Sequence, residues 1–155
     1  MPSISTLLAI LNKVANGRIS VTNGKKGQRR VIFTRIAAGS ITSYSRGIHP
    51  SEAILILRGR STREQVTIDG LAIPPFGSSG PHYSGFSDFF LPFESSYVGT
   101  AHSHPSKSNR PSLDDLNSGF YGTVSIIIGY PNEDDTMVAY ERDGNALEIK
   151  VLNSA

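Results

Sequence analysis

The sequence predicts an α/β domain, because segments with helical spacing alternate with apolar segments that are typical of buried strands. Two of these segments, Ala53–Leu57 and Ile126–Ile128, are continuously apolar, as expected for strands covered on both faces. A chain of 155 residues is long enough for one domain with a proper core. It contains no cysteine, which excludes disulfides and thiolate-rich metal sites.

The N-terminal residues 1–28 are expected to extend this domain with a helix and a hairpin strand. Their apolar side chains recur at helical spacing, at Ile4, Leu7, Leu8, Leu11 and Val14. We expect this stripe to pack on its own domain, with a dimer contact as the alternative. The basic loop Gly24–Arg30 would join Ile19–Thr22 to Val31–Thr34 as a hairpin, and we interpret its charges as those of a solvated turn.

The next part of the chain predicts one helix and two strands. Residues 35–49 are expected to be helical up to the following proline, whose ring disfavours a helical residue before it. The strand Ala53–Leu57 comes directly after Glu52, and a carboxylate at the edge of such an apolar run is unusual. Another strand is predicted at Val66–Ile73, with an irregularity at Asp69-Gly70.

Residues 74–92 break the regular pattern and combine glycines with aromatic side chains. Long loops inside a compact domain are often functional. The candidate substrate contacts in this loop are Phe76, Tyr83, Phe86 and Phe89. The alternative is that the aromatic rings fold back onto the core.

The segment around His102 and His104 predicts a metal site. A strand is expected at Tyr97–His104, and side chains at i and i+2 of a strand point to the same face, so both imidazoles would converge. After a polar loop, Ser112 has the form of a helix N-cap, with Asp115 at the third helical position. Two imidazoles and a carboxylate leave one position of a tetrahedral zinc open, as in catalytic sites.

Each of these residues also has a purely structural interpretation. The two histidines would be ordinary strand residues, Ser112 and Asp115 would only cap a helix, and Glu52 would be the polar end of a strand. The complete pattern of His-Ser-His-Pro followed by Ser-x-x-Asp favours the metal site. We interpret His49 as structural, because the ligand set is complete without it, and His82, which lies in the glycine-rich loop, as solvated.

The C-terminal part predicts a short helix and three strands. The helix spans Leu113–Phe120, and a buried strand follows at Thr123–Tyr130. Met137–Arg142 and Ala146–Leu152 are expected to pair across Asp143-Gly144, which is a strong hairpin turn signal.

These motifs resemble the JAMM motif of the MPN-plus zinc metalloproteases. The matching segments are His102-Ser103-His104-Pro105, Ser112-x-x-Asp115, and His49–Gly59, which contains Glu52. The resemblance covers about residues 30–152, is greatest to short archaeal members, and extends more distantly to the deubiquitinase of the proteasome lid. It implies one MPN domain over residues 1–155, with a mixed, curved central sheet packed with helices in a cytidine-deaminase-like layout.

The resemblance also implies a zinc-dependent isopeptidase that removes a ubiquitin-like modifier from lysine side chains or processes its linear precursor. His102, His104 and Asp115 would bind one zinc ion per chain. Glu52 would take the proton from the attacking water, and Ser112 would donate a hydrogen bond to the developing oxyanion. In the family, the insertion that corresponds to the aromatic loop helps to hold the substrate tail.

Two other classes remain open: a non-catalytic MPN scaffold, which would lack these ligands, and a zinc hydrolase of the same fold that acts on a small amide or short peptide. The expected partners are conjugates of ubiquitin or a ubiquitin-like modifier, in a proteasome-linked pathway. A net charge of +2 is too weak to argue for nucleic acid, and no apolar run is long enough to span a membrane. The first residues lack a signal-peptide pattern, so we expect a cytoplasmic protein.

Overall fold

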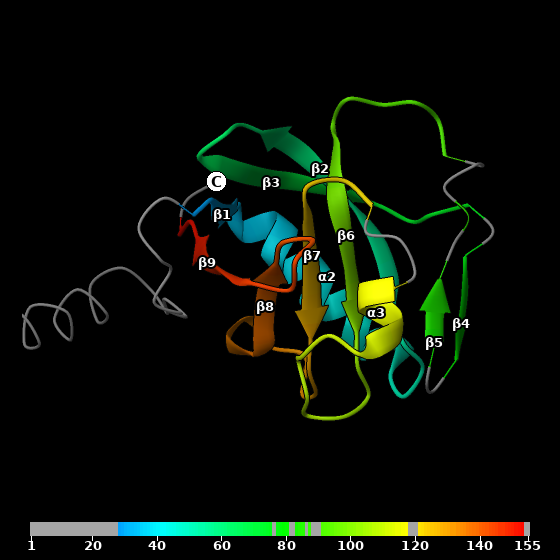
Figure 1. Cartoon of the computed structure of the whole chain (residues 1–155). Coiled ribbons are helices and arrows are strands. Elements are labelled where there is room, and N and C mark those ends of the chain that lie inside the picture. Colours follow the sequence, from blue (N-terminus) through cyan, green and yellow to red (C-terminus); the bar gives the residue numbers. More distant parts are fainter. Residues whose placement is uncertain are drawn as a thin grey trace, which may run out of the picture.

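The computed structural model describes residues 28–75, 77–80, 83–85, 87, 91–117 and 121–153. In this part of the chain, seven strands form a closed barrel in the order β1-β3-β2-β6-β7-β8-β9, and β4 and β5 form a separate two-stranded sheet (Figure 1). The helix predicted at residues 4–14 and the strand predicted at 19–22 lie outside the described residues. None of the described helices is both long and apolar enough to cross a membrane.

The elements have the following bounds. The barrel strands are β1 (Arg30–Phe33), β2 (Ile54–Ser61), β3 (Gln65–Ala72), β6 (Tyr97–Ser103), β7 (Val124–Ile128), β8 (Met137–Tyr140) and β9 (Ala146–Val151). The small sheet contains β4 (Ser78–Gly80) and β5 (Tyr83–Gly85). The helices are α2 (Arg35–Ile48), α3 (Leu113–Asn117) and the short 3-10 helix η2 (Asp134–Thr136).

β1 closes the barrel. It pairs in parallel with β3 along one edge and with β9 along the other, and all four of its residues take part in both ladders. A strand has only two hydrogen-bonding edges, so the predicted hairpin between Val31–Thr34 and Ile19–Thr22 is wrong. The partners of β1 are distant in the sequence, and parallel pairing needs long crossover connections that no local turn signal reveals.

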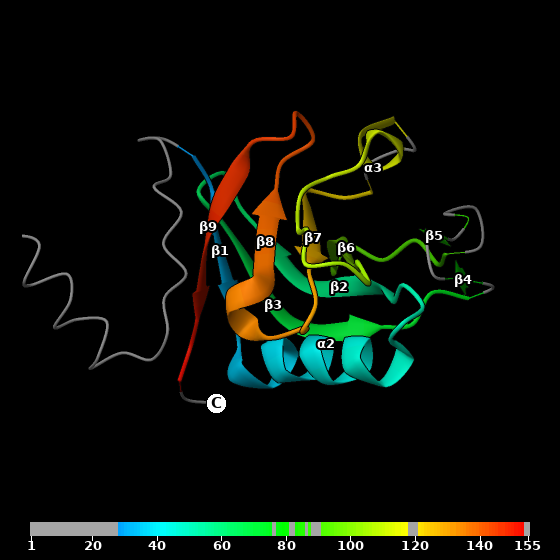
Figure 2. The ribbon, with the colours of Figure 1, turned by 90° about the horizontal axis from the view of Figure 1, so that it is seen from below.

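α2 and the barrel strands share one apolar core. The helix predicted for residues 35–49 is confirmed, and its N-terminus is capped by Thr34, whose hydroxyl accepts a hydrogen bond from the N–H of Ala37 at 3.2 Å. The helix lies along β2 and β3 (Figure 2). Its buried side chains form one cluster with the inward-facing strand residues, the largest of which include Phe33, Leu57, Ile68 and Ile126.

The β2–β3 hairpin contains the predicted irregularity. Arg58 is paired with Gly70 and Gly59 with Ile68, so the ladder skips Asp69. The apolar stretch Leu55–Leu57 of β2 is buried, as its composition predicts.

The expectation that residues 74–92 lack regular structure is partly wrong, because β4 and β5 form an antiparallel pair within them. Their residues, Ser78–Gly80 and Tyr83–Gly85, are mainly serine and glycine. Such segments show no alternation of apolar and polar residues, so the usual sequence signal of a strand is missing.

The remaining elements are observed at or near their predicted positions. The helix predicted at Leu113–Phe120 is described over Leu113–Asn117, and residues 118–120 lie outside the described part of the chain. The β8–β9 hairpin is confirmed, and Gly144 in its turn has a φ of 82°, which suits glycine. The buried strand predicted at Thr123–Tyr130 is observed as β7. The predicted α/β fold with a mixed sheet is confirmed. The sheet also closes into a barrel, which the sequence did not predict.

Candidate metal centre

His102 and His104 lie at the carboxyl end of β6, between its two neighbouring strands. His102 pairs with Ile54 of β2 and with Ile127 of β7. The N–H of His104 donates to the carbonyl oxygen of Ile128 at 2.8 Å, which extends the parallel ladder by one bond. The centroids of the two imidazole rings are 5.1 Å apart, so the side chains converge as the i, i+2 spacing predicts.

α3 brings Asp115 to the two imidazoles. Its carboxylate oxygens lie 3.1 Å from Nε2 of His102 and 3.6 Å from Nε2 of His104. The potential ligand atoms of the three residues all lie within 4.8 Å of one another. The helix begins with the predicted cap: the N–H of Ser112 donates to Asp115 Oδ2 at 2.6 Å, and the N–H of Asp115 donates to Ser112 Oγ at 3.1 Å.

These three residues fit a zinc ion. Nε2 of His102 is buried and has no hydrogen-bond partner of suitable geometry in the described part of the chain, although a carboxylate oxygen of Asp115 is 3.1 Å away. Buried polar atoms are rarely left without a partner, so a nitrogen that faces a second imidazole and a carboxylate is arranged as a metal ligand. Two imidazole nitrogens and one carboxylate oxygen are typical zinc ligands and leave a fourth position open.

His104 is oriented from the far side of its ring by the loop that follows it. Its Nδ1 is 3.1 Å from the carbonyl oxygen of Ser108. A carbonyl oxygen only accepts, so Nδ1 donates to it, and in the neutral ring the lone pair of Nε2 is available for a metal ion. Sequence analysis missed Ser108, because it acts through its backbone and its side-chain type carries no signal.

The electrostatics of the site couple these side chains. The hydrogen bond with Asp115 raises the pKa of His104, burial opposes this, and the charges of Asp115 and Glu52 add to the increase. Burial acts to raise the pKa of Asp115, but interactions with His102 and His104 outweigh it and hold that pKa well below its ordinary value. Asp115 is therefore ionised at neutral pH, as a metal ligand must be.

Glu52 lies just before β2, within electrostatic reach of His104. It is half-buried, and its N–H donates to the carbonyl oxygen of Gly80 at the end of β4 at 2.8 Å. The structure therefore brings the predicted base to the same end of the barrel as the three potential ligands. His49, the one histidine predicted to be structural, packs against Tyr130 with ring centroids 4.9 Å apart.

Most of the predicted substrate contacts cannot be placed. Phe76, Phe86 and Phe89 lie outside the described residues, as does His82. Tyr83 belongs to β5, so only its backbone position is described.

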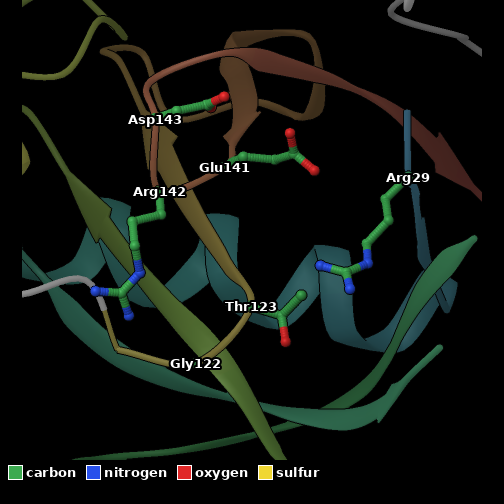
Figure 3. A pocket seen from close by; sticks show the side chains of 6 residues that line it. All are labelled: Arg29, Gly122, Thr123, Glu141, Arg142 and Asp143. Carbon is green, nitrogen blue, oxygen red and sulfur yellow. The ribbon is translucent and has the colours of Figure 1, made fainter. Parts of the chain in front are cut away.

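A cavity of about 480 Å³ lies beside the residues that precede β7 (Figure 3). Its lining consists of Arg29, Gly122, Thr123, Glu141, Arg142 and Asp143. The N–H of Thr123 donates to the carbonyl oxygen of Val98 near the start of β6, whereas the two histidines lie at the end of that strand. The cavity therefore lies toward the start of β6, and its lining includes none of the three potential metal ligands.

The family model described as prokaryotic homologs of the JAB domain matches residues 37–143. The chain belongs to this family. A probable metalloprotease from Haloferax volcanii is 31% identical over 112 residues, which make up 68% of this chain and 70% of that protein.

Solved structures show the same JAB/MPN fold. A JAB1/MPN domain protein from Archaeoglobus fulgidus is 32% identical, with a TM-score of 0.58 over 78% of this chain and 98% of that chain. A structure reported as JAMM, a metalloprotease-like zinc site in the proteasome and signalosome, is 30% identical, with a TM-score of 0.58 over 80% of this chain and 99% of that chain. A protein from Desulfitobacterium hafniense shares the fold at 17% identity, with a TM-score of 0.59 over 78% of this chain and 92% of that chain.

Proposed function

We propose that this JAB-family protein is a zinc-dependent isopeptidase, which removes a ubiquitin-like modifier from lysine side chains or processes its linear precursor. The observation that carries the proposal is the convergence of Glu52 with His102, His104 and Asp115 at one end of the barrel. A relative described as a probable metalloprotease and another with a metalloprotease-like zinc site support this class of reaction.

The side chains of the site have different roles in the proposed amide hydrolysis. A zinc ion held by His102, His104 and Asp115 would supply a Lewis acid and lower the pKa of a water molecule toward ~7. Glu52 takes the proton from the attacking water and passes it to the leaving amine. The hydroxyl oxygen of Ser112 accepts a hydrogen bond from the backbone N–H of Asp115, so its hydroxyl hydrogen can donate to the developing oxyanion.

The surroundings of the site favour a protein substrate over a small amide. Leu113 and Leu116, on the same short helix as Asp115, are 78% and 49% exposed. Exposed apolar side chains beside a site suit a protein surface. The bond between Glu52 and Gly80 places the β4–β5 pair next to the proposed base, where an extended modifier tail can add along a strand edge.

In this proposal, the tail contacts are Phe76, Tyr83, Phe86 and Phe89, and the partners are conjugates of a ubiquitin-like modifier in a proteasome-linked cytoplasmic pathway. For the N-terminal apolar stripe we propose packing on its own domain, with a dimer contact as the alternative. We propose no role for nucleic acid or a membrane.

Metal content and substrate preference test the proposal together. Protein purified without added metal should contain one zinc per chain by elemental analysis, and a chelator should abolish cleavage until zinc is restored. The same preparation is offered a lysine-linked modifier conjugate, a linear precursor and a small amide. Cleavage of the small amide alone would refute the isopeptidase assignment, and failure to take up zinc would refute the metal site.

A further inference from the structure

β2 and β6 end their pairing next to the metal centre. The last pair of their antiparallel ladder joins Ile54 to His102. One residue further on, the N–H of Ser103 donates to the carbonyl oxygen of Ala53 at 3.0 Å. The N–H of Ala53 donates in turn to the side-chain hydroxyl of Ser103 at 2.9 Å. One serine therefore binds both backbone polar groups of Ala53.

Both residues are shielded from water. Ala53 is 2% exposed and Ser103 is 3% exposed. A buried backbone N–H needs a partner within the protein, and the hydroxyl of Ser103 provides it here. Without this hydroxyl the N–H of Ala53 loses its acceptor, which favours a shift of the local backbone.

This pair of bonds connects the two halves of the proposed active site. Ser103 is the residue between the two histidines, and Ala53 directly follows Glu52. On its other side, Glu52 is bonded through its N–H to the carbonyl oxygen of Gly80. The backbone around Glu52 is therefore held by β4 and by β6, which contains His102 and directly precedes His104.

We propose that Ser103 is a positioning residue, whose hydroxyl sets the place of Glu52 relative to His102 and His104. The proposal rests on the proposed function, in which Glu52 is the base. A general base must lie within hydrogen-bond reach of the proton that it accepts, and a misplacement of about 1 Å can cost ~10²-fold in rate. The hydroxyl acts through the backbone of Ala53 and does not touch the reacting atoms.

Three variants of the zinc-loaded full chain test this role. Ser103→Ala removes the hydroxyl and Ser103→Thr retains it. Thr42→Ala is the matched control, because it removes another buried hydroxyl with a backbone partner: the hydroxyl of Thr42, on α2, donates to the carbonyl oxygen of Gly39. We expect Ser103→Ala to keep zinc content and KM while kcat falls ~10- to 100-fold. Ser103→Thr should restore most of kcat, and Thr42→Ala should keep it.

Two NMR measurements report on the same contact without turnover. They are the hydrogen exchange of the Ala53 amide and the side-chain carboxyl carbon resonance of Glu52. In Ser103→Ala, the amide should exchange at least ~10-fold faster and the Glu52 resonance should shift, while Ser103→Thr and Thr42→Ala stay near wild type. If Ser103→Ala does not fold, Ser103→Cys replaces it with the same expectations, because a thiol is a weaker acceptor.

The results separate the two proposals. A wild-type protein that holds zinc but cleaves neither a conjugate nor an amide would refute the proposed function, while the NMR measurements still decide the role of Ser103. An active wild type overturns the positioning role alone if Ser103→Ala keeps its kcat, or if kcat falls as far in Thr42→Ala. Unchanged Ala53 exchange and Glu52 resonance in Ser103→Ala would also overturn it.

Discussion

At the scale of single residues, Glu52 and His104 have different tasks and should separate by mutation. Glu52→Gln keeps the shape of the side chain but removes its ability to accept a proton. We expect zinc content and folding to remain near wild type while turnover of a modifier conjugate falls by ~10²–10⁴, the range typical for the loss of a general base. His104→Ala removes one potential ligand, so zinc and activity should be lost together.

Paired measurements of zinc content and cleavage rate on both variants check this difference. If Glu52 is only the polar end of a strand, Glu52→Gln will cleave the conjugate at nearly the wild-type rate. That outcome would show that another group serves as the base.

Protons should compete with zinc for His104. Its pKa is raised above the ordinary value of 6.5, mainly by the hydrogen bond with Asp115. In the metal-free protein, protonated His104 therefore stabilises the fold fully below pH 6.5, and this contribution is lost as the pH rises through the raised pKa. Zinc requires the neutral ring, so its affinity should change in the opposite direction and fall as the pH decreases through that pKa.

Competition with a chelating dye between about pH 6 and pH 8 measures this dependence, after correction for protonation of the dye. A zinc affinity that stays constant over the whole interval would contradict it.

At the scale of structural elements, the loop after β6 must pack closely against the end of β7 to orient His104. A Cβ atom added to Gly129 would lie 2.8 Å from the carbonyl oxygen of Lys107, a backbone atom that cannot rotate away. Gly129→Ala should therefore displace the loop that provides the carbonyl of Ser108. We expect zinc affinity to fall ~10- to 100-fold, as when other groups that orient a ligand are lost.

Gly47→Ala on α2 is the control for this loop variant, because nothing lies within 4 Å of the added atom. It should leave zinc affinity unchanged and keep or slightly increase the melting temperature, since alanine favours a helix. Equal zinc affinities in Gly129→Ala and Gly47→Ala would exclude a role of the loop in orienting the ligand.

The β4–β5 segment should contribute to substrate binding rather than to the metal site. Replacing residues 76–90 by a short Gly-Ser linker should raise KM for a modifier conjugate strongly, because backbone hydrogen bonds to an extended tail are lost. Zinc content should remain at the wild-type level. Steady-state kinetics and elemental analysis of the same preparation check both statements, and unchanged kinetics would rule out the tail contact.

At the scale of the whole molecule, β1 is the strand on which closure of the barrel depends. Phe33 of β1 is fully buried, at 0% exposure, and is among the largest side chains of the core. Phe33→Ala should lower the free energy of unfolding by ~3–5 kcal/mol, because it removes apolar contacts and leaves a cavity. Urea unfolding measures this loss.

Ile36→Ala is the comparison for this core variant, since Ile36 is 68% exposed on α2. Its free energy of unfolding should stay within about 0.5 kcal/mol of wild type. A similar loss in both variants would mean that the packing of β1 contributes no more to stability than an exposed position does.

Sequence by itself determined the features whose signals lie within a few residues of one another. The i, i+2 spacing of His102 and His104 placed both rings on one face, because a strand alternates its side chains. The Ser-x-x-Asp pattern predicted the cap that Ser112 and Asp115 form, and Asp-Gly predicted the turn between β8 and β9. Each of these signals is local, so its geometry follows without knowledge of the rest of the fold.

Tertiary structure alone decided which distant backbone groups meet. The partners of β1, the carbonyl of Ser108 behind His104 and the bonds between Ser103 and Ala53 all join segments that no local pattern connects. Backbone N–H and C=O groups are the same in almost every residue, so residue type does not reveal which of them will pair. Their pairing is set by the packing of the whole barrel, and through these groups the barrel orients His104 and holds the backbone around Glu52.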